Sequence, residues 1–369
     1  MAPKKKLLLL TIGYGQGHRS AALALQEEFL ARGWEVLLWD PCESDRTGIY
    51  RLTKYYYRLC VRRAPWLWGI TYAQTNTADW RSKVTRPGLR SVVRVMLDKL
   101  VEWAPDVVLC TYPIYGYMLD YLRSRAGIVV PYGMVVTDAI EISKPWVHAD
   151  ADWLYVPDEY SRELLTTRYS LRECNVLSTG FPVRRSYLEP TAITPPTEAH
   201  LSILYGVYLS TVETVRQIES LLARYPHARI CMICGNRAEK MRRKLVGYIE
   251  QGQVSVIDAC SDMASLFAAS HLYIGKTGAA TMFEAYAKGV PFIANFALPG
   301  QEQGNLELML RDGVGVHAAT SEELLGAVTS LLDNGAARWM MMRQRMLRLR
   351  HRVGGAIHIA DEVEFHVVK

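Results

Sequence analysis

The stretch from Ile274 to Asn305 constrains the fold more than any other part of the chain. A short apolar run ends at Gly275, the small-residue turn GKTGAAT follows, and TMFEAYAKG reads as a short helix. Gly289 would end that helix, because glycine readily adopts a positive φ. The backbone N–H groups at the start of such a helix form an anion site, and the next apolar run, VPFIANF, leads into the polar loop PGQEQGN. A plain βαβ unit with a polar turn gives the same pattern, so the turn alone does not establish a phosphate site.

The same alternation of apolar runs and helical segments fills two halves of the 369-residue chain, which is long enough for two domains. Four prolines between Pro182 and Pro196 mark the expected linker. We therefore expect domains at 1–185 and 186–335, followed by a helical segment at 336–369. In that segment Trp339, Met342, Met346 and Leu349 share one helical stripe, which favours packing on a core over a membrane-surface helix.

Composition narrows the class of protein. Half of the residues are hydrophobic, yet no window is apolar for the roughly 18 to 20 residues that a membrane span needs. The apolar run after the basic start is too short for a signal peptide, so we expect a cytosolic protein. Seven scattered cysteines indicate reduced thiols, and Cys231 and Cys234, although spaced like a redox pair, lie in an apolar run that reads as a buried strand.

A second glycine turn, GYGQGH, follows the first apolar run. Gly13, Gly15 and Gly17 would let the backbone turn sharply beside a ligand, but the spacing differs from GxGxxG and no acid is apparent about twenty residues on. His18 would stand at a helix start, where the dipole lowers its pKa and keeps the ring able to accept a proton; a solvent-facing histidine is the alternative. Asp138 directly follows a predicted strand, which suits either a ligand site or a helix N-cap.

Positive charge and aromatic rings gather in one segment. Between Arg46 and Arg94 there are eleven Lys or Arg residues against one acid, whereas the whole chain carries only +6. Eight Tyr and Trp residues lie between Tyr50 and Trp80. This mixture suits an anionic membrane surface, a helix hairpin packed on the domain, or single-stranded nucleic acid, and we favour the membrane. The predicted membrane patch comprises Tyr55, Tyr56, Arg58, Arg62, Arg63, Trp66 and Trp68.

A series of motifs runs along the chain in the order GYGQGHRSAA, TYP, VTDAI, WVHADADWLYVPDEY, STGFPVR, CGNR, GKTGAATMFEA, KGVP and PGQEQGN. In these motifs the chain is similar to the processive diacylglycerol glycosyltransferases and monogalactosyldiacylglycerol synthases, relatives of MurG. The resemblance implies an α/β fold of GT-B type, with two facing Rossmann-like domains and a C-terminal helix packing back. It also implies hexose transfer from a UDP-sugar to a lipid acceptor at the inner membrane face. The anomeric configuration would be inverted, with no metal or other cofactor and no nucleic acid partner.

The resemblance also assigns roles to residues. It makes His18 the general base, places Asp138 near the acceptor, and puts the nucleotide ribose on Glu284. The further donor contacts that it implies are Gly206, Gly235, Thr277, Gly278, Ala279, Thr281, Gln301, Glu302 and Asn305. Those implied around the acceptor and phosphate loop are Gly15, Gly17 and Tyr112.

One departure from the family pattern keeps alternatives open. Where relatives carry a glycine-rich turn, this chain has Gly206, Val207, Tyr208 and Leu209. Bulky side chains there hold the backbone away from a phosphate. A degenerate relative that binds lipid or nucleotide without catalysis, or a nucleotide-sugar epimerase on the same fold, are the alternatives. The oligomeric state is not predicted.

Overall fold

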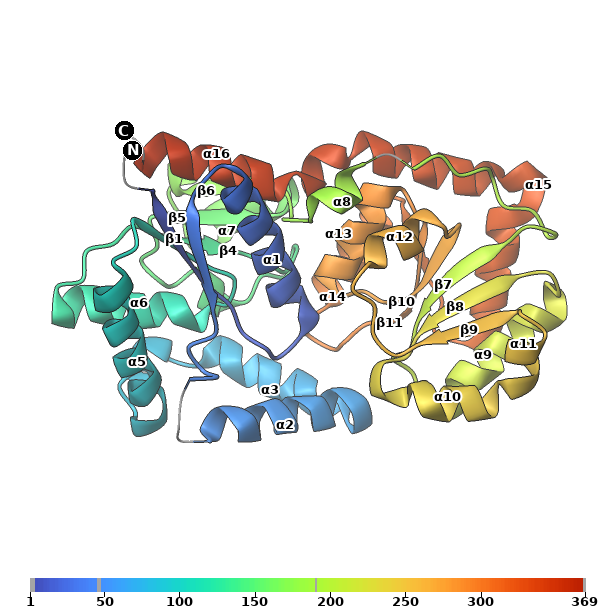
Figure 1. The fold of residues 1–369 in the computed structure, drawn as a ribbon, viewed down its shortest axis with the longest axis horizontal. Helices are drawn as coiled ribbons and strands as arrows, with labels where there is room; N and C mark the ends of the chain where they lie inside the picture. The colour runs from blue at the N-terminus through green and yellow to red at the C-terminus, as the bar shows by residue number, and fades with distance from the viewer. Residues whose placement is uncertain (1–3, 45–47, 190, 368–369) are drawn as a thin grey trace. The chain divides into compact units, whose positions relative to one another are not determined.

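A computed structural model describes residues 4–44, 48–189 and 191–367, and it divides the chain into two compact units (Figure 1). The first unit comprises residues 1–185, 298–304 and 351–369, and the second comprises 186–297 and 305–350. The division at Arg185 and Ser186 falls inside the proline-rich stretch. Residues 336–350 group with the second unit, so only the last part of the expected C-terminal segment groups with the first.

The first unit is built on a parallel sheet of six strands in the order β2-β1-β3-β4-β5-β6. Its strands are β1 (Lys6–Leu10), β2 (Glu35–Trp39), β3 (Val107–Cys110), β4 (Tyr132–Val135), β5 (Trp153–Val156) and β6 (Val176–Ser178). The central strands read as continuous apolar runs because helices cover both faces of the sheet. The helices are α1 (Gln16–Ala31), α2 (Ile49–Arg63), α3 (Pro65–Thr77), α4 (Trp80–Lys83), α5 (Pro87–Trp103), α6 (Ile114–Ala126), α7 (Glu159–Tyr169) and α16 (Gly355–Val367), with 3₁₀ turns η1 (Lys144–Trp146), η2 (Glu173–Asn175) and η4 (Arg350–Val353).

Alternate residues of each strand face the two sides of this sheet. In β1, Leu8 and Leu10 join a core with α5 and α6, whereas Leu7 and Leu9 join a second core with α1 and α16. This alternation is the two-residue period of a strand. The C-terminal helix therefore completes the hydrophobic core of the N-terminal sheet, as expected from the resemblance.

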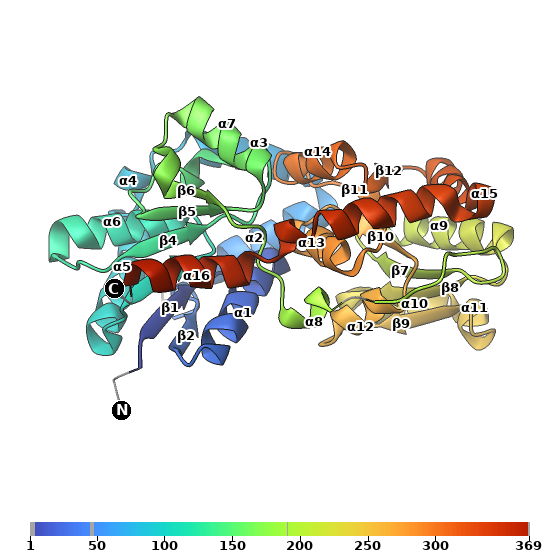
Figure 2. The same cartoon turned by 90° about the horizontal axis from the view of Figure 1, so that it is seen from above.

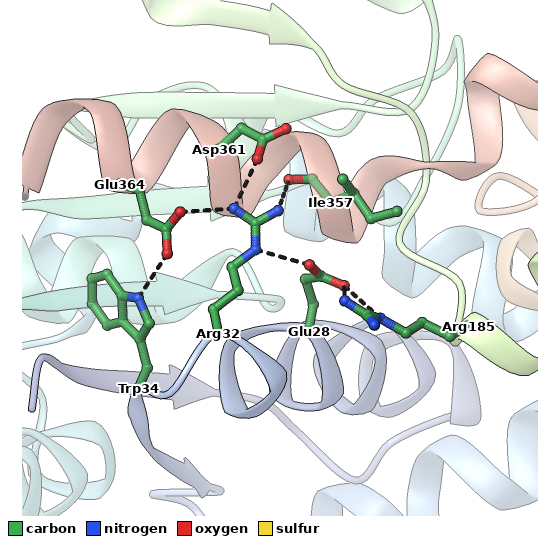
Figure 3. Close-up of polar contacts among 7 residues, drawn as sticks. All are labelled: Glu28, Arg32, Trp34, Arg185, Ile357, Asp361 and Glu364. Atoms are coloured by element: carbon green, nitrogen blue, oxygen red, sulfur yellow. Dashed lines mark hydrogen bonds and ion pairs between the residues drawn. The ribbon is translucent and has the colours of Figure 1, made fainter.

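Charged side chains fasten α16 along α1 (Figures 2 and 3). Arg32 bonds Glu28 at 2.8 Å and reaches Asp361 at 2.7 Å and Glu364 at 2.8 Å on α16. The nearly buried Glu28 also pairs with Arg185 at 2.8 Å. Burial opposes the charge on Arg32, but the bonds to these carboxylates outweigh it and raise its pKa. The network fixes which face of α16 covers the sheet.

The second unit repeats the plan with a parallel sheet in the order β12-β11-β10-β7-β8-β9. Its strands are β7 (Ser202–Gly206), β8 (Arg229–Ile233), β9 (Val254–Ile257), β10 (Leu272–Lys276), β11 (Phe292–Phe296) and β12 (Gly315–His317). The remaining helices are α8 (Arg185–Leu188), α9 (Thr211–Arg224), α10 (Ala238–Lys244), α11 (Val246–Glu250), α12 (Met263–Ala268), α13 (Ala279–Lys288), α14 (Gln303–Arg311) and α15 (Ser321–Arg348), with the 3₁₀ turn η3 (Gly235–Arg237). Cys231 lies within β8 and Cys234 is buried just after it, which confirms the strand interpretation, and all seven cysteines are free thiols.

Helix α15 is interrupted at Asp333–Ala336, where the backbone leaves the helical region. Beyond the interruption Trp339, Met342 and Met346 are buried, and the Trp339 indole donates to the His271 carbonyl at 2.7 Å. This confirms that the arginine- and methionine-rich stretch packs on a core. The core that it joins is that of the second unit.

Candidate functional site

His18 lies in the first turn of α1, directly after the glycine turn that follows β1. Its Nδ1 is 2.8 Å from the Thr137 hydroxyl, and the Tyr112 ring stands edge-on with its centroid 5.3 Å from the imidazole centroid. Burial lowers the pKa of His18 to about 4 and outweighs a hydrogen bond with the Thr111 backbone. The ring is therefore oriented and uncharged near pH 7, which is the state that a general base needs.

Asp138 lies close to His18, at the carboxyl end of β4. It is 8% exposed and accepts a hydrogen bond from the Trp146 indole at 3.3 Å. The Trp146 ring centroid is in turn 6.3 Å from that of His18. The first unit thus brings His18 together with Tyr112 and with the segment of Asp138, which both lie about a hundred residues further along the chain.

The glycine turn beside His18 is held by an acid that the sequence analysis missed. Asp40, just after β2, accepts from the Gly13 N–H at 3.0 Å and from the hydroxyls of Tyr50 at 2.9 Å and Tyr115 at 3.0 Å. The expectation that no acid lies about twenty residues after the turn is therefore wrong, since Asp40 follows the second strand directly, where a dinucleotide-binding unit carries an acid. Its oxygens are occupied by the protein, so it shapes the turn.

The two other glycines of the turn have different surroundings. Gly15 is the N-cap of α1 in extended backbone, and a Cβ there would approach only the Tyr57 hydroxyl, at 3.6 Å. A Cβ on Gly17 would meet nothing within 4 Å. A side chain would fit at Gly17, so packing within the protein does not require glycine at this position.

Helices α2 and α3 form an antiparallel hairpin (Figure 1). Aromatic and apolar side chains of both helices are exposed to solvent. Tyr55 and Trp66 are each 65% exposed, and Leu52 and Ile70 accompany them. Arg58 and Arg63 are also exposed, while the side chain of Arg62 lies outside the described part of the structure. Tyr56 is 37% exposed and Trp68 is half-buried, so the hairpin combines a packed side with an open aromatic and basic side. Within residues 4–44, 48–189 and 191–367, no helix is both long and apolar enough to cross a bilayer.

The loop Leu298–Gly304 groups with the first unit and packs on the hairpin. The Trp68 indole donates to Gln301 Oε1 at 3.1 Å, and Glu302 accepts from the Leu298 N–H at 3.0 Å. A Cβ on Gly304 would lie 2.1 Å from the Ala139 carbonyl, so only glycine allows the loop to approach the segment after Asp138 this closely. Gln301 and Glu302 therefore lie on the same unit as His18.

In the second unit, β10, the small-residue turn and α13 have the predicted geometry. Gly289 ends α13 with φ +66, and Glu284, 8% exposed, lies in the helix. Thr277 is buried, donates its N–H to the Phe296 carbonyl at 3.2 Å and accepts from the Asn305 side chain at 3.1 Å. Thr277 and Asn305 thus brace the turn. The anion donors that remain are the first N–H groups of α13, beginning after its N-cap Gly278 and including those of Ala279 and Thr281.

The segment Val207–Leu209, which replaces the glycine-rich turn of the family pattern, is held by hydrogen bonds from Arg237. Val207 is buried, and the Arg237 guanidinium donates to the carbonyls of both Val207 and Leu209. Arg237 ends the turn η3, which begins at Gly235 with φ +54, a conformation that favours glycine. Gly235 therefore positions Arg237 under the loop after β7.

The described residues bring together no group of three or more His, Cys, Asp or Glu side chains suited to a metal ion. The metal independence implied by the resemblance stays a prediction.

Comparison with known proteins finds one family model for each half of the chain. The family model for monogalactosyldiacylglycerol synthase matches residues 18–183, and that for the glycosyltransferase family 28 C-terminal domain matches residues 209–306. A processive diacylglycerol beta-glucosyltransferase of Bacillus subtilis (strain 168) is 27% identical over 343 residues, covering 90% of this chain and 88% of the relative.

Solved structures support the fold. Acinetobacter baumannii MurG superposes with a TM-score of 0.58 at 15% identity, covering 98% of this chain and 100% of MurG. The calicheamicin glycosyltransferase CalG4 superposes with a TM-score of 0.60 at 14% identity, covering 99% of each chain. Together with the two six-stranded parallel sheets, these matches confirm the GT-B fold class. The family models and the relative together identify the chain as a glycosyltransferase that is similar to the diacylglycerol glycosyltransferases and monogalactosyldiacylglycerol synthases.

Proposed function

We propose that this protein transfers a hexose, glucose or galactose, from a UDP-sugar to the hydroxyl of diacylglycerol or a similar lipid alcohol, with inversion at the anomeric carbon. The observation that carries the proposal is the partly buried, neutral His18, whose ring contacts Thr137 next to Asp138, in a chain that matches the monogalactosyldiacylglycerol synthase model. A lipid hydroxyl is a weak nucleophile until a base removes its proton. An oriented, uncharged imidazole is suited to that task near pH 7.

The acceptor half of the reaction uses His18 and the residues around it. The imidazole takes the proton of the lipid hydroxyl while its oxygen forms a bond to the anomeric carbon of the sugar. Thr137 fixes the ring in place through the 2.8 Å contact to Nδ1. Asp138, held by the Trp146 indole, adds negative charge that favours the imidazolium as it forms.

The donor half uses the second unit. Glu284 accepts hydrogen bonds from the ribose hydroxyls, and the first N–H groups of α13 stabilise the diphosphate as its bond to the sugar breaks and UDP leaves. Gln301 and Glu302, on the loop that groups with the first unit, bind sugar hydroxyls, and Asn305 braces the small-residue turn through the Thr277 carbonyl. This assignment follows the family resemblance and is supported by the burial and hydrogen bonds of these residues.

The hairpin of α2 and α3 serves as the contact with the membrane. Exposed aromatic rings such as Tyr55 and Trp66 suit the headgroup region, and Arg58 and Arg63 attract anionic lipid. The lipid acceptor is then taken from the inner leaflet, on the cytosolic side. Attraction to anionic lipid should weaken as salt is added, because exposed charges are screened.

The experiment supplies purified protein with vesicles of diacylglycerol and anionic lipid and a panel of UDP-sugars, and identifies glycolipid by mass spectrometry. We expect a product that contains one hexose from UDP-glucose or UDP-galactose. His18→Ala should abolish it, whereas His227→Ala, an exposed histidine of the second unit, should leave it unchanged. No glycolipid from any sugar would contradict the proposal, and a modified UDP-sugar formed without lipid would indicate an epimerase.

A further inference from the structure

The point where the second sheet reverses its strand order carries two side chains without an assigned role. The chain builds β7, β8 and β9 outward and then returns to place β10 on the other side of β7. In open parallel sheets, ligands bind at the carboxyl ends of the two strands that flank such a reversal. Lys276 is the last residue of β10, and Tyr208 lies two residues beyond the end of β7.

These two side chains contact each other. The Lys276 ammonium lies over the Tyr208 ring, 5.4 Å from its centroid, which is within the range of a cation–π interaction. Tyr208 is 40% exposed, so the pair lies at the surface of the strand ends, where a ligand has access.

Local backbone geometry directs both side chains to this place. The pairing of β10 with β11 shifts register between Gly275 and Lys276, and such irregularities re-aim the side chains that follow. A Cβ on Gly206 would lie only 3.0 Å from Tyr208 Cε2. The absence of a side chain at Gly206 therefore lets the tyrosine ring lie against the end of β7.

Hydrogen bonds to its backbone also fix the loop that carries Tyr208. Arg237 donates to the carbonyls on either side of Tyr208, those of Val207 and Leu209. The buried Val207 N–H donates to the Ile233 carbonyl at 3.1 Å. These three bonds fix the backbone of the loop that carries the Tyr208 ring.

We propose that Lys276 binds the diphosphate of the nucleotide donor and that Tyr208 is the positioning residue that holds the ammonium there. The inference rests on the proposed function, because it assigns a phosphate ligand within the same donor site. A glycine-rich turn would offer backbone N–H groups to the phosphates, whereas this loop carries the bulky residues Val207 and Tyr208, and the Val207 N–H is already bonded to the Ile233 carbonyl. A lysine ammonium can instead bind the phosphates directly as a positive charge. Lys276 is close to the other proposed phosphate donors, because α13 begins only three residues after it.

The first test measures binding of UDP, UMP and uridine by titration calorimetry. Lys276→Met keeps the apolar stem and removes the charge. We expect it to weaken UDP binding by at least about tenfold and uridine binding hardly at all, since the lost charge contacts only the phosphates. The matched control is Lys240→Met on α10, an exposed lysine of the same unit, which should bind UDP as the wild type does.

The second test addresses Tyr208. Tyr208→Phe keeps the ring face and should retain UDP affinity, whereas Tyr208→Ala should weaken UDP binding several-fold and leave uridine binding unchanged. In a double variant with Lys276→Met, the loss caused by Tyr208→Ala should largely disappear, because the ring acts through the lysine. Unchanged melting temperatures would show that each variant is folded.

The outcomes separate this inference from the proposed function. The inference is overturned, and the transferase proposal stands, if Lys276→Met binds UDP as well as the wild type does. The same holds if the variant loses affinity for uridine by the same factor as for UDP. If Tyr208→Ala weakens UDP binding as much in the Lys276→Met variant as in the wild type, the positioning role of Tyr208 is overturned. If the wild type binds no UDP at any accessible concentration, both proposals are overturned together.

Discussion

His18 should remain uncharged at a pH where an ordinary histidine is protonated, and the rate of the enzyme should show it. The structure holds the partly buried ring with its Nδ1 2.8 Å from the Thr137 hydroxyl, and loss of solvation lowers the pKa from 6.5 to about 4. Because protonation would remove the base, the acidic limb of kcat/KM against pH follows the pKa of His18 in the free enzyme. That limb should lie near pH 4.

At pH 5.5 the protonated fraction of His18 should be far smaller than that of an unperturbed histidine. With a pKa of 6.5 roughly nine in ten imidazoles would be protonated there, and kcat/KM would fall about tenfold from its plateau. With a pKa of about 4 only about one imidazole in thirty is protonated, so the rate should be almost unchanged. The two expectations differ by about an order of magnitude at a single pH.

The same shift makes stability depend on pH in a defined direction. The folded state holds His18 at the lower pKa, so below pH 6.5 the unfolded chain binds more protons and stability falls as the pH falls toward 4. The complete shift corresponds to about 3 kcal/mol, fully present above pH 6.5 and lost by the time the pH has passed below 4. His18→Gln should remove this part of the pH dependence.

The assay combines pH–rate profiles with NMR titration of the histidine rings. His271 also has a pKa lowered to about 4, by burial first, so comparison with His18→Gln is needed to assign the His18 resonance. An acidic limb near pH 6.5 together with a His18 resonance titrating at that pH would refute the reasoning.

Four further predictions follow from the site and the fold. Glu284→Gln should weaken UDP binding about tenfold or more in calorimetry, because the ribose loses a charged acceptor, while Glu239→Gln on exposed α10 should not. EDTA should leave turnover unchanged; activity lost to EDTA and restored by Mg²⁺ would contradict a metal-independent mechanism. Replacing Tyr55 and Trp66 together by alanine should reduce sedimentation with anionic vesicles at least several-fold without changing UDP affinity. Glu28→Gln should lower the free energy of unfolding by roughly 2–3 kcal/mol in urea titrations, because two arginines lose a nearly buried partner, and an unchanged midpoint would contradict that role.

The β10–turn–α13 unit can be predicted from the sequence because its signals are local. An apolar run, a turn of small residues and a helix ended by Gly289 each depend on the conformational preferences of neighbouring residues. The pairing of His18 with Asp138 also follows from topology, since both residues follow the carboxyl ends of parallel strands that gather at one edge of a sheet.

Contacts between distant segments are harder to predict, because no local pattern records them. The PGQEQGN loop reads as a continuation of the second unit, yet the glycine at 304 and the Trp68 bond to Gln301 place it with the first. Asp40 follows a predicted strand, but its role depends on hydrogen bonds from the Gly13 N–H and two tyrosine hydroxyls, which no local sequence pattern indicates. Likewise, the support that Arg237 gives to Val207 and Leu209 has no signature in sequence spacing.

The most direct test of the central claim is glycolipid formation by wild type and His18→Ala at saturating UDP-sugar, with UDP affinity measured on the same samples. If His18 is the general base, turnover should fall by about 100-fold or more while the Kd for UDP stays the same. A His18→Ala variant that forms glycolipid at the wild-type rate would contradict the mechanism.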